Sequence, residues 1–443
     1  MEIETLYKYF KECTSVTTDS RNCPEGSMFI ALKGDRFNGN AFARQALEEG
    51  CRYAVVDEPE YAAADEPEYA AADEPRILLV DDCLKALQQL ANYHRCAMKQ
   101  LKVLGITGTN GKTTTKELIA TVLQKKYKVL YTQGNLNNHI GVPLTLLRLT
   151  EEHEVAVVEM GANHPGEIRT LVNIVMPDAG LITNVGKAHL EGFGSFEGVK
   201  KTKGELYDFL DGRERNEAFV DAANPHLMEM QQERRLSPVF YAASPGTGAA
   251  FEGKLLSCSP FLSFEWTSNE GGGRVDTHLI GSYNLTNAMA AVAVGRTFGV
   301  SVADVCDAIG GYVPTNNRSQ LTETPFNQLV VDAYNANPTS MMAAIENFRL
   351  MEVPHKIVLL GDMKELGEGS REEHRKVVEH LRQCDFERIV LVGPEFAEVH
   401  AEFEHYPDME ALKNVLSENR PEGCYILIKG SNSMKMHRLV DVL

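Results

Sequence analysis

The residues best suited to chemistry form one glycine- and threonine-rich string: Gly108, Thr109, Asn110, Gly111, Lys112, Thr113 and Thr114. The string follows the apolar segment LKVLGIT and opens a helical segment near Lys112, so backbone N–H groups and a helix dipole would converge on a phosphate. Lys112 would neutralise the β- and γ-phosphates, and Thr113 stands where a hydroxyl ligand for Mg²⁺ is needed. Because the Walker spacing wants glycine where Ile106 stands, the pattern predicts a variant phosphate loop; a chance glycine turn is the alternative.

A phosphate loop needs a second metal ligand, usually an acid at the end of a neighbouring buried strand. The segment VAVVEM offers Glu159 in that place, although Glu159 taken alone could be a capped strand end. Further along, AGLITNV runs into Gly186-Lys187-Ala188-His189, which puts His189 beyond another strand end, where the crevice of an α/β sheet is expected. A lone histidine is more often structural.

A basic string, Lys200-Lys201-Thr202-Lys203-Gly204-Glu205, follows eleven positions after His189. Its simplest interpretation is a solvated helix face, and this suits at least two of the three lysines. The downstream sequence contains no NKxD string of the kind that reads guanine, which counts against a GTP-driven switch protein.

These residues need an α/β scaffold, and the sequence predicts three domains of that class. Residues 1–98 form a small α/β domain with strands at 29–32, 53–56 and 77–80, and residues 99–313 form a larger α/β domain with a β-rich elaboration over 212–280. Residues 314–443 form a third domain in which QLVVDA, KIVLLGD, RIVLVG and CYILIKG predict a largely parallel sheet.

Composition and charge limit the function classes. The 443 residues are 43% hydrophobic and 24% charged, as in an ordinary soluble globular protein. A net charge of −18 disfavours binding to nucleic acid or to anionic membranes. The charged first ten residues do not resemble a secretory signal, and no later run is long enough to span a bilayer, so we expect a cytoplasmic protein. Nine scattered cysteines are expected to be reduced core residues.

An acidic eight-residue unit, DEPEYAAA, occurs twice from Asp57 to Ala72 and begins a third time. Proline recurs every eight residues and interrupts any helix, so an expanded surface loop is expected and no chemistry is assigned to it.

Seven strings, in this order, resemble the ATP-dependent Mur ligase family over essentially the whole chain. They are VTTDSR from Val16, GTNGKTTTKE from Gly108, GNLNNHIGVPLTLL from Gly134, VEMGANHPGEI from Val158, NVGKAHLEGFGS from Asn184, DAYNANPTSM from Asp332 and GDMKELG from Gly361. The resemblance implies an amino-terminal UDP-sugar domain, a central ATPase domain and a carboxy-terminal Rossmann-like domain. It also implies ATP and Mg²⁺ as cofactors, small-molecule substrates as partners and a monomeric state.

Within the family, GNLNNHIGVP and DAYNANPTSM resemble the branch that joins D-Ala-D-Ala to UDP-N-acetylmuramoyl-tripeptide, giving the pentapeptide used in peptidoglycan synthesis. The implied reaction phosphorylates the tripeptide carboxylate to an acyl phosphate, which the dipeptide amine then attacks. A neighbouring ligase, adding a diamino acid to the muramoyl dipeptide or glutamate to folate, is the alternative; the DNPR string of the diamino-acid enzymes is absent. A binding protein that has lost catalysis is a third class, disfavoured because the predicted catalytic residues are all present.

The resemblance also implies roles for single residues. Lys112, Glu159, His189 and Lys203 match the catalytic positions, and Lys203 matches a lysine that CO₂ carbamylates in the family. A carbamate would replace a cation by a carboxylate-like group, able to join Thr113, Glu159 and His189 as ligands of Mg²⁺. ATP contacts beyond the phosphate loop would come from Asn284, Asn287, Arg318 and Asp332. Tyr283 stands where many relatives have histidine, and Asn317 replaces the usual glycine before Arg318.

Substrate contacts implied by the resemblance lie in three places. Thr18, Asp19, Ser20 and Arg21 resemble the uridine-binding string, and Asn135, Asn137 and Asn138 resemble the substrate loop of this branch; residue types alone would make both polar turns. Asn335 and Asn337 are expected to shape the dipeptide side. Lys429 and Ser431 end the last strand before a helix, a place for an anion such as the dipeptide carboxylate. A plain helix cap is the alternative for Ser431.

Overall fold

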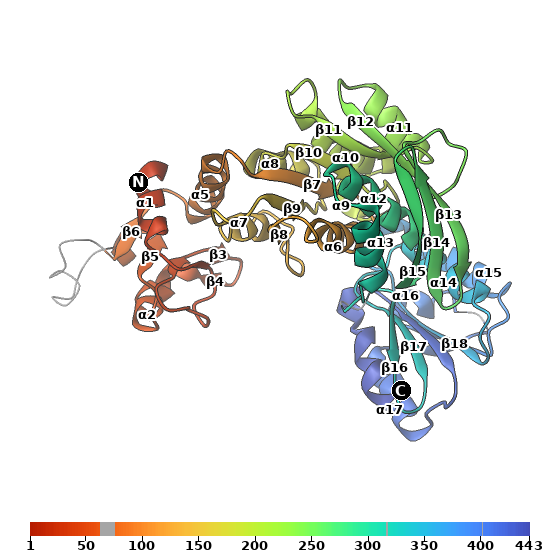
Figure 1. The fold of residues 1–443 in the computed structure, drawn as a ribbon. Helices are drawn as coiled ribbons and strands as arrows, with labels where there is room; N and C mark the ends of the chain where they lie inside the picture. The colour runs from red at the N-terminus through yellow and green to blue at the C-terminus, as the bar shows by residue number, and fades with distance from the viewer. Residues whose placement is uncertain (63–75, 316–317, 401) are drawn as a thin grey trace. The chain divides into compact units, whose positions relative to one another are not determined.

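The protein is described by a computed structural model that covers residues 1–62, 76–315, 318–400 and 402–443. The chain divides into two compact units. Figure 1 draws the helices and strands of the described residues, coloured from the N-terminus to the C-terminus. The first comprises residues 1–105, 128–161 and 169–178, and the second comprises residues 106–127, 162–168 and 179–443. The observed fold is a mixed α/β fold, as the sequence predicts.

The first unit begins with a four-stranded parallel sheet in the order β1 (Val16–Thr17), β2 (Met28–Ile30), β5 (Tyr53–Val56) and β6 (Ile77–Leu79). The three strands predicted in this region are confirmed. The other elements here are α1 (Ile3–Lys11), the hairpin of β3 (Lys33–Gly34) and β4 (Phe37–Asn38), η1 (Gly39–Phe42), α2 (Ala43–Glu48) and α5 (Cys83–Ala97).

The described start of the acidic repeat differs from the expected loop. Pro59–Ala62 forms one helical turn, α3, because proline is tolerated in the first turn of a helix. Asp57 and Glu58 each approach the Lys33 ammonium at 2.9 Å, and Asp57 also accepts hydrogen bonds from the Asn40 side chain and the Cys83 N–H. The first two residues of the repeat therefore help to hold the domain together, while residues 63–75 lie outside the described part.

The remainder of the first unit includes the parallel pair β8 (Val129–Tyr131) and β9 (Val155–Glu159) and the helix α7 (Gly141–Leu146). β9 ends at Glu159, as predicted. β7 (Lys102–Thr107) and α8 (Glu167–Val175) run from one unit into the other along the chain. β9 is buried throughout and β7 is buried after Lys102, which is typical of interior strands in a parallel sheet.

The second unit contains β10 (Ala179–Ile182), β11 (Glu217–Asp221) and β12 (Ser237–Ala242), which pair in parallel. The sheet continues through β13 (Phe251–Cys258), β14 (Phe261–Ser268) and β15 (Gly271–Ile280). β13 pairs with β12 in parallel, whereas β14 is antiparallel to both β13 and β15. This confirms the β-rich elaboration. Its helices are α6 (Lys112–Leu123), α9 (Leu190–Phe193), α10 (Phe196–Leu210), α11 (Pro225–Gln232), α12 (Asn284–Thr297) and α13 (Val302–Gly311).

A six-stranded sheet follows in the second unit, in the order β16 (Gln320–Glu323), β17 (Gln328–Asp332), β21 (Tyr425–Lys429), β18 (Lys356–Gly361), β19 (Arg388–Val392) and β20 (Glu404–Tyr406). All its pairs are parallel except β16 with β17. The four predicted strands are confirmed; the short, half-buried edge strands β16 and β20 escaped sequence analysis.

Helices cover both faces of this sheet, and a separate apolar core lies under each set. They are α14 (Pro338–Leu350), α15 (Ser370–Leu381), α16 (Pro394–Ala397), α17 (Met409–Glu418) and the 3₁₀ segments η2 (Gly367–Gly369), η3 (Asn432–Met434) and η4 (Met436–Val442). Because β21 lies between β17 and β18, the carboxyl ends of these three strands meet, and crevices at such ends hold ligands in α/β sheets.

All nine cysteines are free thiols, but the expectation that they fill cores is only partly correct. Cys51, Cys83 and Cys424 are buried, whereas Cys96 is exposed on α5. Among the described helices, none combines the length and apolarity required to cross a membrane.

Candidate active site

The phosphate loop joins β7 to α6, as the sequence predicts. Gly108 has φ +143° and Gly111 has φ +76°, in the region that favours glycine. A Cβ at Gly108 would lie 2.0 Å from Thr183 Oγ1, and one at Gly111 would lie 2.6 Å from Asn287 Oδ1. Both glycines are therefore required by backbone conformation and by close neighbours.

Lys112 opens α6, and its ammonium donates to the carbonyls of Gly108 (2.8 Å) and Thr109 (3.0 Å). Thr113 follows in the first turn and is buried, and Thr114 is half-buried beside it. The loop thus sets the position of the cation predicted to meet phosphate.

Asn110 is fixed within the loop by residues that follow β10. Its N–H donates to Asn184 Oδ1 (3.0 Å), and its carbonyl accepts from Thr183 Oγ1 (2.6 Å) and Asn184 Nδ2 (3.0 Å). Its side-chain oxygen accepts from Asn337 Nδ2 at 2.7 Å. Sequence analysis missed Thr183 and Asn184 as supports of the loop, although Asn184 opens one of the family strings.

Asn284 and Asn287, expected on the adenine side, form a buried chain behind the loop. Asn284 Nδ2 donates to Ile280 O (2.8 Å), Asn287 Nδ2 donates to Asn284 Oδ1 (2.8 Å), and Thr115 Oγ1 donates to Asn287 Oδ1 (3.1 Å). In this structure the two asparagines brace α6 against α12.

Glu159 is buried at the end of β9, within the first unit. Its N–H donates to Thr132 Oγ1 (3.0 Å), and its carboxylate accepts from Asn137 Nδ2 (2.7 Å). Asn137, expected to bind substrate, therefore orients the predicted metal ligand. Its neighbour Asn138 uses its side-chain oxygen to accept from the N–H groups of residues 140 and 141, whereas Asn135 is exposed.

His189 precedes α9 with φ +50°, and its ring lies against the Glu365 carboxylate. Burial lowers the pKa of His189, while Glu365 acts in the opposite direction. Two residues earlier, Lys187 approaches Glu373 at 3.6 Å. Glu365 lies in the string GDMKELG, but no spacing rule links it to His189, so this contact was not predictable from the sequence.

Lys203 is the buried lysine of the basic string on α10, only 2% exposed. Its ammonium nitrogen donates to Ala162 O (3.2 Å) and lies 5.3 Å from the centre of the Phe193 ring. Burial, reinforced by the charge of Lys112, holds the pKa of Lys203 well below its usual range. Lys201 is exposed and Lys200 pairs with Glu229, so these two lysines fit the predicted solvated helix face. The buried Lys203 does not.

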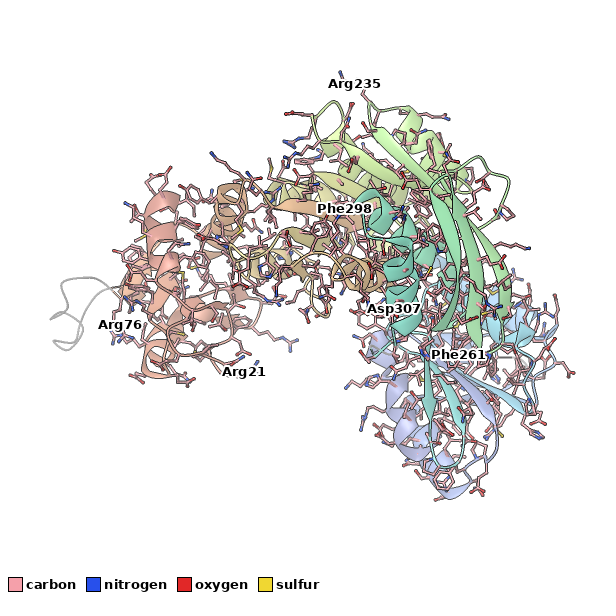
Figure 2. All side chains as sticks on the ribbon, viewed as in Figure 1. Arg21, Arg76, Arg235, Phe261, Phe298 and Asp307 are labelled. Carbon is pink, nitrogen blue, oxygen red and sulfur yellow. The ribbon has the colours of Figure 1, made fainter. Side chains whose placement is uncertain are left out.

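The predicted uridine string follows edge strand β1 in the first unit. Thr18 and Ser20 are half-buried, and Arg21 donates from Nε to Asp19 Oδ1 (2.8 Å) and from Nη2 to Asp19 Oδ2 (2.9 Å). These bonds lower the pKa of Asp19 to about 2. The Arg21 side chain is 86% exposed at the surface of this unit (Figure 2).

The carboxyl ends of β17 and β21 carry a buried ion pair. Lys429 Nζ lies 2.6 Å from Asp332 Oδ2 and also donates to Asn335 O (3.3 Å). Ser431 accepts from the Lys364 N–H (2.9 Å) and donates to Ala336 O (3.4 Å). The helix-cap interpretation of Ser431 is wrong, since its side chain makes no cap bond to the 3₁₀ turn η3 that follows.

Arg318 lies over the Tyr334 ring, its guanidinium carbon 3.7 Å from the ring centre. Next to it Ser319 contacts the hydroxyl of Tyr283, whose pKa is raised by burial and by the nearby Asp332. Tyr283, Arg318 and Asp332 thus belong to one neighbourhood, while Asn317 lies outside the described residues.

The structure therefore gathers the phosphate loop, Asn284, Asn287 and Asn337 into one hydrogen-bonded group in the second unit. In the described part of the chain, no three His, Cys, Asp or Glu side chains are placed together as a metal site. The predicted magnesium set includes only two such residues, Glu159 and His189, beside Thr113 and Lys203.

Three family models match consecutive parts of the chain. They are described as "Mur ligase family, catalytic domain" over residues 12–95, "Mur ligase middle domain" over residues 106–295 and "Mur ligase, glutamate ligase domain" over residues 317–432.

Known proteins resemble the chain over nearly its whole length. A Bacillus subtilis protein named UDP-N-acetylmuramoyl-tripeptide--D-alanyl-D-alanine ligase is 36% identical, with 97% of this chain and 92% of that protein covered. The structure of MurF from Acinetobacter baumannii has a TM-score of 0.85 at 30% identity, covering 99% and 97%. MurF from Thermotoga maritima in complex with ADP has a TM-score of 0.83 at 27% identity, covering 98% and 97%. With a phosphate loop built as described above and these full-length similarities, the chain belongs to the Mur ligase family.

Proposed function

We propose that this protein is an ATP-dependent ligase that joins D-Ala-D-Ala to UDP-N-acetylmuramoyl-tripeptide, producing the pentapeptide precursor of peptidoglycan, ADP and phosphate. The observation that carries the proposal is the phosphate loop at Gly108–Thr114, seated in a chain whose full-length relatives bear the name of this ligase. A neighbouring amino-acid ligase is not favoured, because the relatives with high identity are named for the dipeptide-adding reaction.

ATP supplies the leaving group, because a carboxylate does not acylate an amine until one of its oxygens can depart. The tripeptide carboxylate oxygen attacks the γ-phosphorus, and the bond from that phosphorus to the β–γ bridging oxygen of ATP breaks. The dipeptide amine then attacks the acyl carbon, and phosphate leaves with the substrate oxygen while the amine loses a proton. Positioning, rather than a protein nucleophile, accelerates these steps.

Lys112 is the proposed partner of the transferred phosphoryl group, with the N–H groups of the loop around it. Gly108 and Gly111 allow the loop to pack closely on its neighbours, since a side chain at either position would meet Thr183 or Asn287. Arg318 and Asp332 are proposed to contact the nucleotide outside the phosphates. The ADP complex of the Thermotoga maritima relative supports nucleotide use by this fold.

Thr113 and Glu159 are the proposed oxygen ligands of Mg²⁺, because hydroxyl and carboxylate oxygens are the donors that this ion prefers. Bound there, it would withdraw charge from the phosphate oxygens. His189 is the proposed nitrogen ligand. Asn137 holds one oxygen of Glu159 and so would fix the orientation of that carboxylate.

Lys203 suits carbamylation because burial favours its neutral amine, which is the form that attacks CO₂. In that step the nitrogen bonds to the carbon of CO₂ and loses a proton, leaving a carboxylate-like group. Lys201 on the same helix is exposed and lacks this burial.

The UDP-sugar is proposed to bind at Thr18, Asp19, Ser20 and Arg21, and its tripeptide near Asn135, Asn137 and Asn138. The dipeptide is proposed to lie near Asn335, Asn337, Lys429 and Ser431. The predicted domains, 1–98, 99–313 and 314–443, would hold the UDP-sugar, ATP and dipeptide respectively. We further propose a monomer that works in the cytoplasm.

To test the function, the protein is incubated with ATP, Mg²⁺ and UDP-N-acetylmuramoyl-tripeptide, and the mass of the product is measured by mass spectrometry. Parallel samples contain D-Ala-D-Ala, a diamino acid or no amine. A pentapeptide product with D-Ala-D-Ala alone supports the proposal. A product with the diamino acid would assign the protein to the diamino-acid branch of the family. If no product formed, a binding protein without catalysis would be favoured.

A further inference from the structure

Asn337 lies between β17 and α14 and is the N-cap residue of α14. Its Oδ1 accepts from the Ser340 N–H (2.9 Å), and its own N–H donates to Ser340 Oγ (3.1 Å). The two residues thus form a reciprocal capping box at a helix that starts with proline. Serine, threonine or aspartate could supply the same acceptor, so capping alone does not require asparagine.

The amide nitrogen of Asn337 has a different partner. Nδ2 donates to Asn110 Oδ1 at 2.7 Å, and Asn337 is only 8% exposed. Aspartate has no donor at this position, and serine is too short to keep both the cap and a bond to Asn110. The feature that distinguishes asparagine from other caps is therefore the group that reaches the phosphate loop.

Asn110 transmits this contact to the residues that meet phosphate. Thr183 and Asn184 already fix its backbone, so the bond from Asn337 restrains its side chain as well. The following residues are Gly111 and Lys112, whose ammonium is held by carbonyls of the same loop. A change at Asn337 would thus alter the loop next to the proposed phosphoryl-binding lysine.

We propose that Asn337 is a positioning residue for ATP, which ties α14 and the carboxyl end of β17 to the phosphate loop through Asn110. This replaces the expectation that its side chain shapes the dipeptide site. Through this contact, the segment that follows Asp332 and the loop that carries Lys112 hold one another in a single arrangement. The inference rests on the proposed function, in which the two segments serve the amine and ATP respectively.

The test is a double-mutant cycle with Asn337→Ser, Asn110→Ala and both changes together. Asn337→Ser keeps an N-cap and removes the donor, while Asn110→Ala removes the acceptor. The matched control is Asn224→Ser, because Asn224 caps α11 by accepting from the N–H groups of His226 and Leu227 and also precedes a proline. The readouts are ADP affinity by calorimetry, KM for ATP and for the dipeptide, kcat, and the midpoint of thermal unfolding.

Each single change should weaken ADP binding or kcat/KM for ATP by about three- to tenfold, the effect of one lost hydrogen bond, and leave KM for the dipeptide nearly unchanged. ADP affinity and kcat/KM for ATP in the double variant should be no lower than in the more affected single variant, because both changes remove the same bond. Asn224→Ser should keep normal ADP affinity, and the change in its thermal midpoint shows the cost of replacing an asparagine cap by serine.

The proposal would be overturned if the losses in ADP affinity of the two single variants multiplied in the double variant. It would also be overturned if Asn337→Ser and Asn224→Ser had the same ADP affinity and the same KM for ATP. A rise confined to KM for the dipeptide would return Asn337 to the dipeptide site. ADP binding reports on the loop whether or not ligation occurs. A wild-type protein that binds ADP but makes no pentapeptide would therefore contradict the proposed function and leave the cycle readable.

Discussion

The phosphate loop and the Thr18–Arg21 turn are both polar strings that resemble family motifs, yet the structure treats them differently. The phosphate loop in the second unit is held by Thr183, Asn184 and Asn337, which come from two other segments. The turn in the first unit is held by bonds within its own segment, from Thr17, Asp19 and Arg21, and Arg21 is exposed.

This difference indicates how each region would bind its ligand. A loop whose bonds reach distant segments is rigid before ATP arrives, so little ordering cost remains and the geometry is fixed for phosphoryl transfer. An exposed turn can exchange the Asp19–Arg21 pairing for contacts with a ligand, because surface ion pairs contribute little to stability. Damage to the buried site should therefore affect the chemical step, and damage to the turn should affect binding of one substrate.

The largest effect is expected from Lys203→Ala. Removing a buried group that is proposed to hold the metal should lower kcat on the order of 100-fold or more. Lys201→Ala, an exposed change on the same helix, is the control and should keep activity. Short carboxylic acids added to the assay should restore part of the loss, because they would replace the carbamate. Full activity in Lys203→Ala would rule out the carbamate.

Gly111→Ala should come next, because it adds a Cβ against Asn287 at a positive φ. The left-handed conformation alone costs an alanine roughly 1 kcal/mol, and the contact at 2.6 Å adds to it. We expect ADP affinity, measured by calorimetry, to fall on the order of tenfold or more. Gly246→Ala provides the comparison, since Gly246 has φ +80° and its added Cβ would meet no described atom within 4 Å. Equal ADP affinity in both variants would show that the loop is not rigid.

Arg21→Ala tests the exposed side of the comparison. Loss of a charged hydrogen-bonding partner should raise KM for the UDP-substrate about tenfold, with kcat, ADP affinity and the thermal midpoint unchanged. Arg52→Ala removes another exposed arginine of the same unit, which pairs with Glu12, and should keep KM normal. A fall in kcat with normal KM in Arg21→Ala would place the turn among the residues of the chemical step.

The smallest effect is expected from removing residues 57–64. Because the two repeat units are identical, the shortened chain equals one that lacks residues 65–72, and it retains the Asp–Glu pair that meets Lys33. Removing one of two identical units should change the free energy of unfolding by about 0.5 kcal/mol or less and leave turnover intact. Asp57→Asn should destabilise the first unit more than this deletion. If the deletion abolished turnover, the acidic repeat would be shown to contribute to activity.

Much of the fold was predictable because its signals are local. The apolar runs at β7, β17 and β21 and the glycines at 108 and 111 specify strand, loop and helix start over a few residues. The edge strands β16 and β20 were missed because each is short and half-buried, with weak alternation. The helical turn at Pro59–Ala62 was missed because proline was treated as a helix breaker rather than as a first-turn residue.

The contacts among the predicted site residues were less predictable than the residues that carry the family strings. Asn137 is predicted to bind substrate and Asn337 to shape the dipeptide side, and these remain predictions; the structure adds a further role for each, in holding Glu159 and Asn110. Such roles depend on contacts over 22 and 227 positions, which no spacing rule contains. The burial of Lys203 beside exposed Lys201 likewise depends on how α10 packs and not on the string itself.

The most direct test of the central claim follows one oxygen atom. The substrate is UDP-N-acetylmuramoyl-tripeptide labelled with ¹⁸O in its terminal carboxylate. It is incubated with the protein, ATP and D-Ala-D-Ala, and the isotopic mass of the released phosphate is measured by mass spectrometry. Ligation through an acyl phosphate predicts that one labelled oxygen enters each phosphate formed with pentapeptide. Phosphate that carries no label while pentapeptide accumulates would contradict the acyl phosphate and the account built on it.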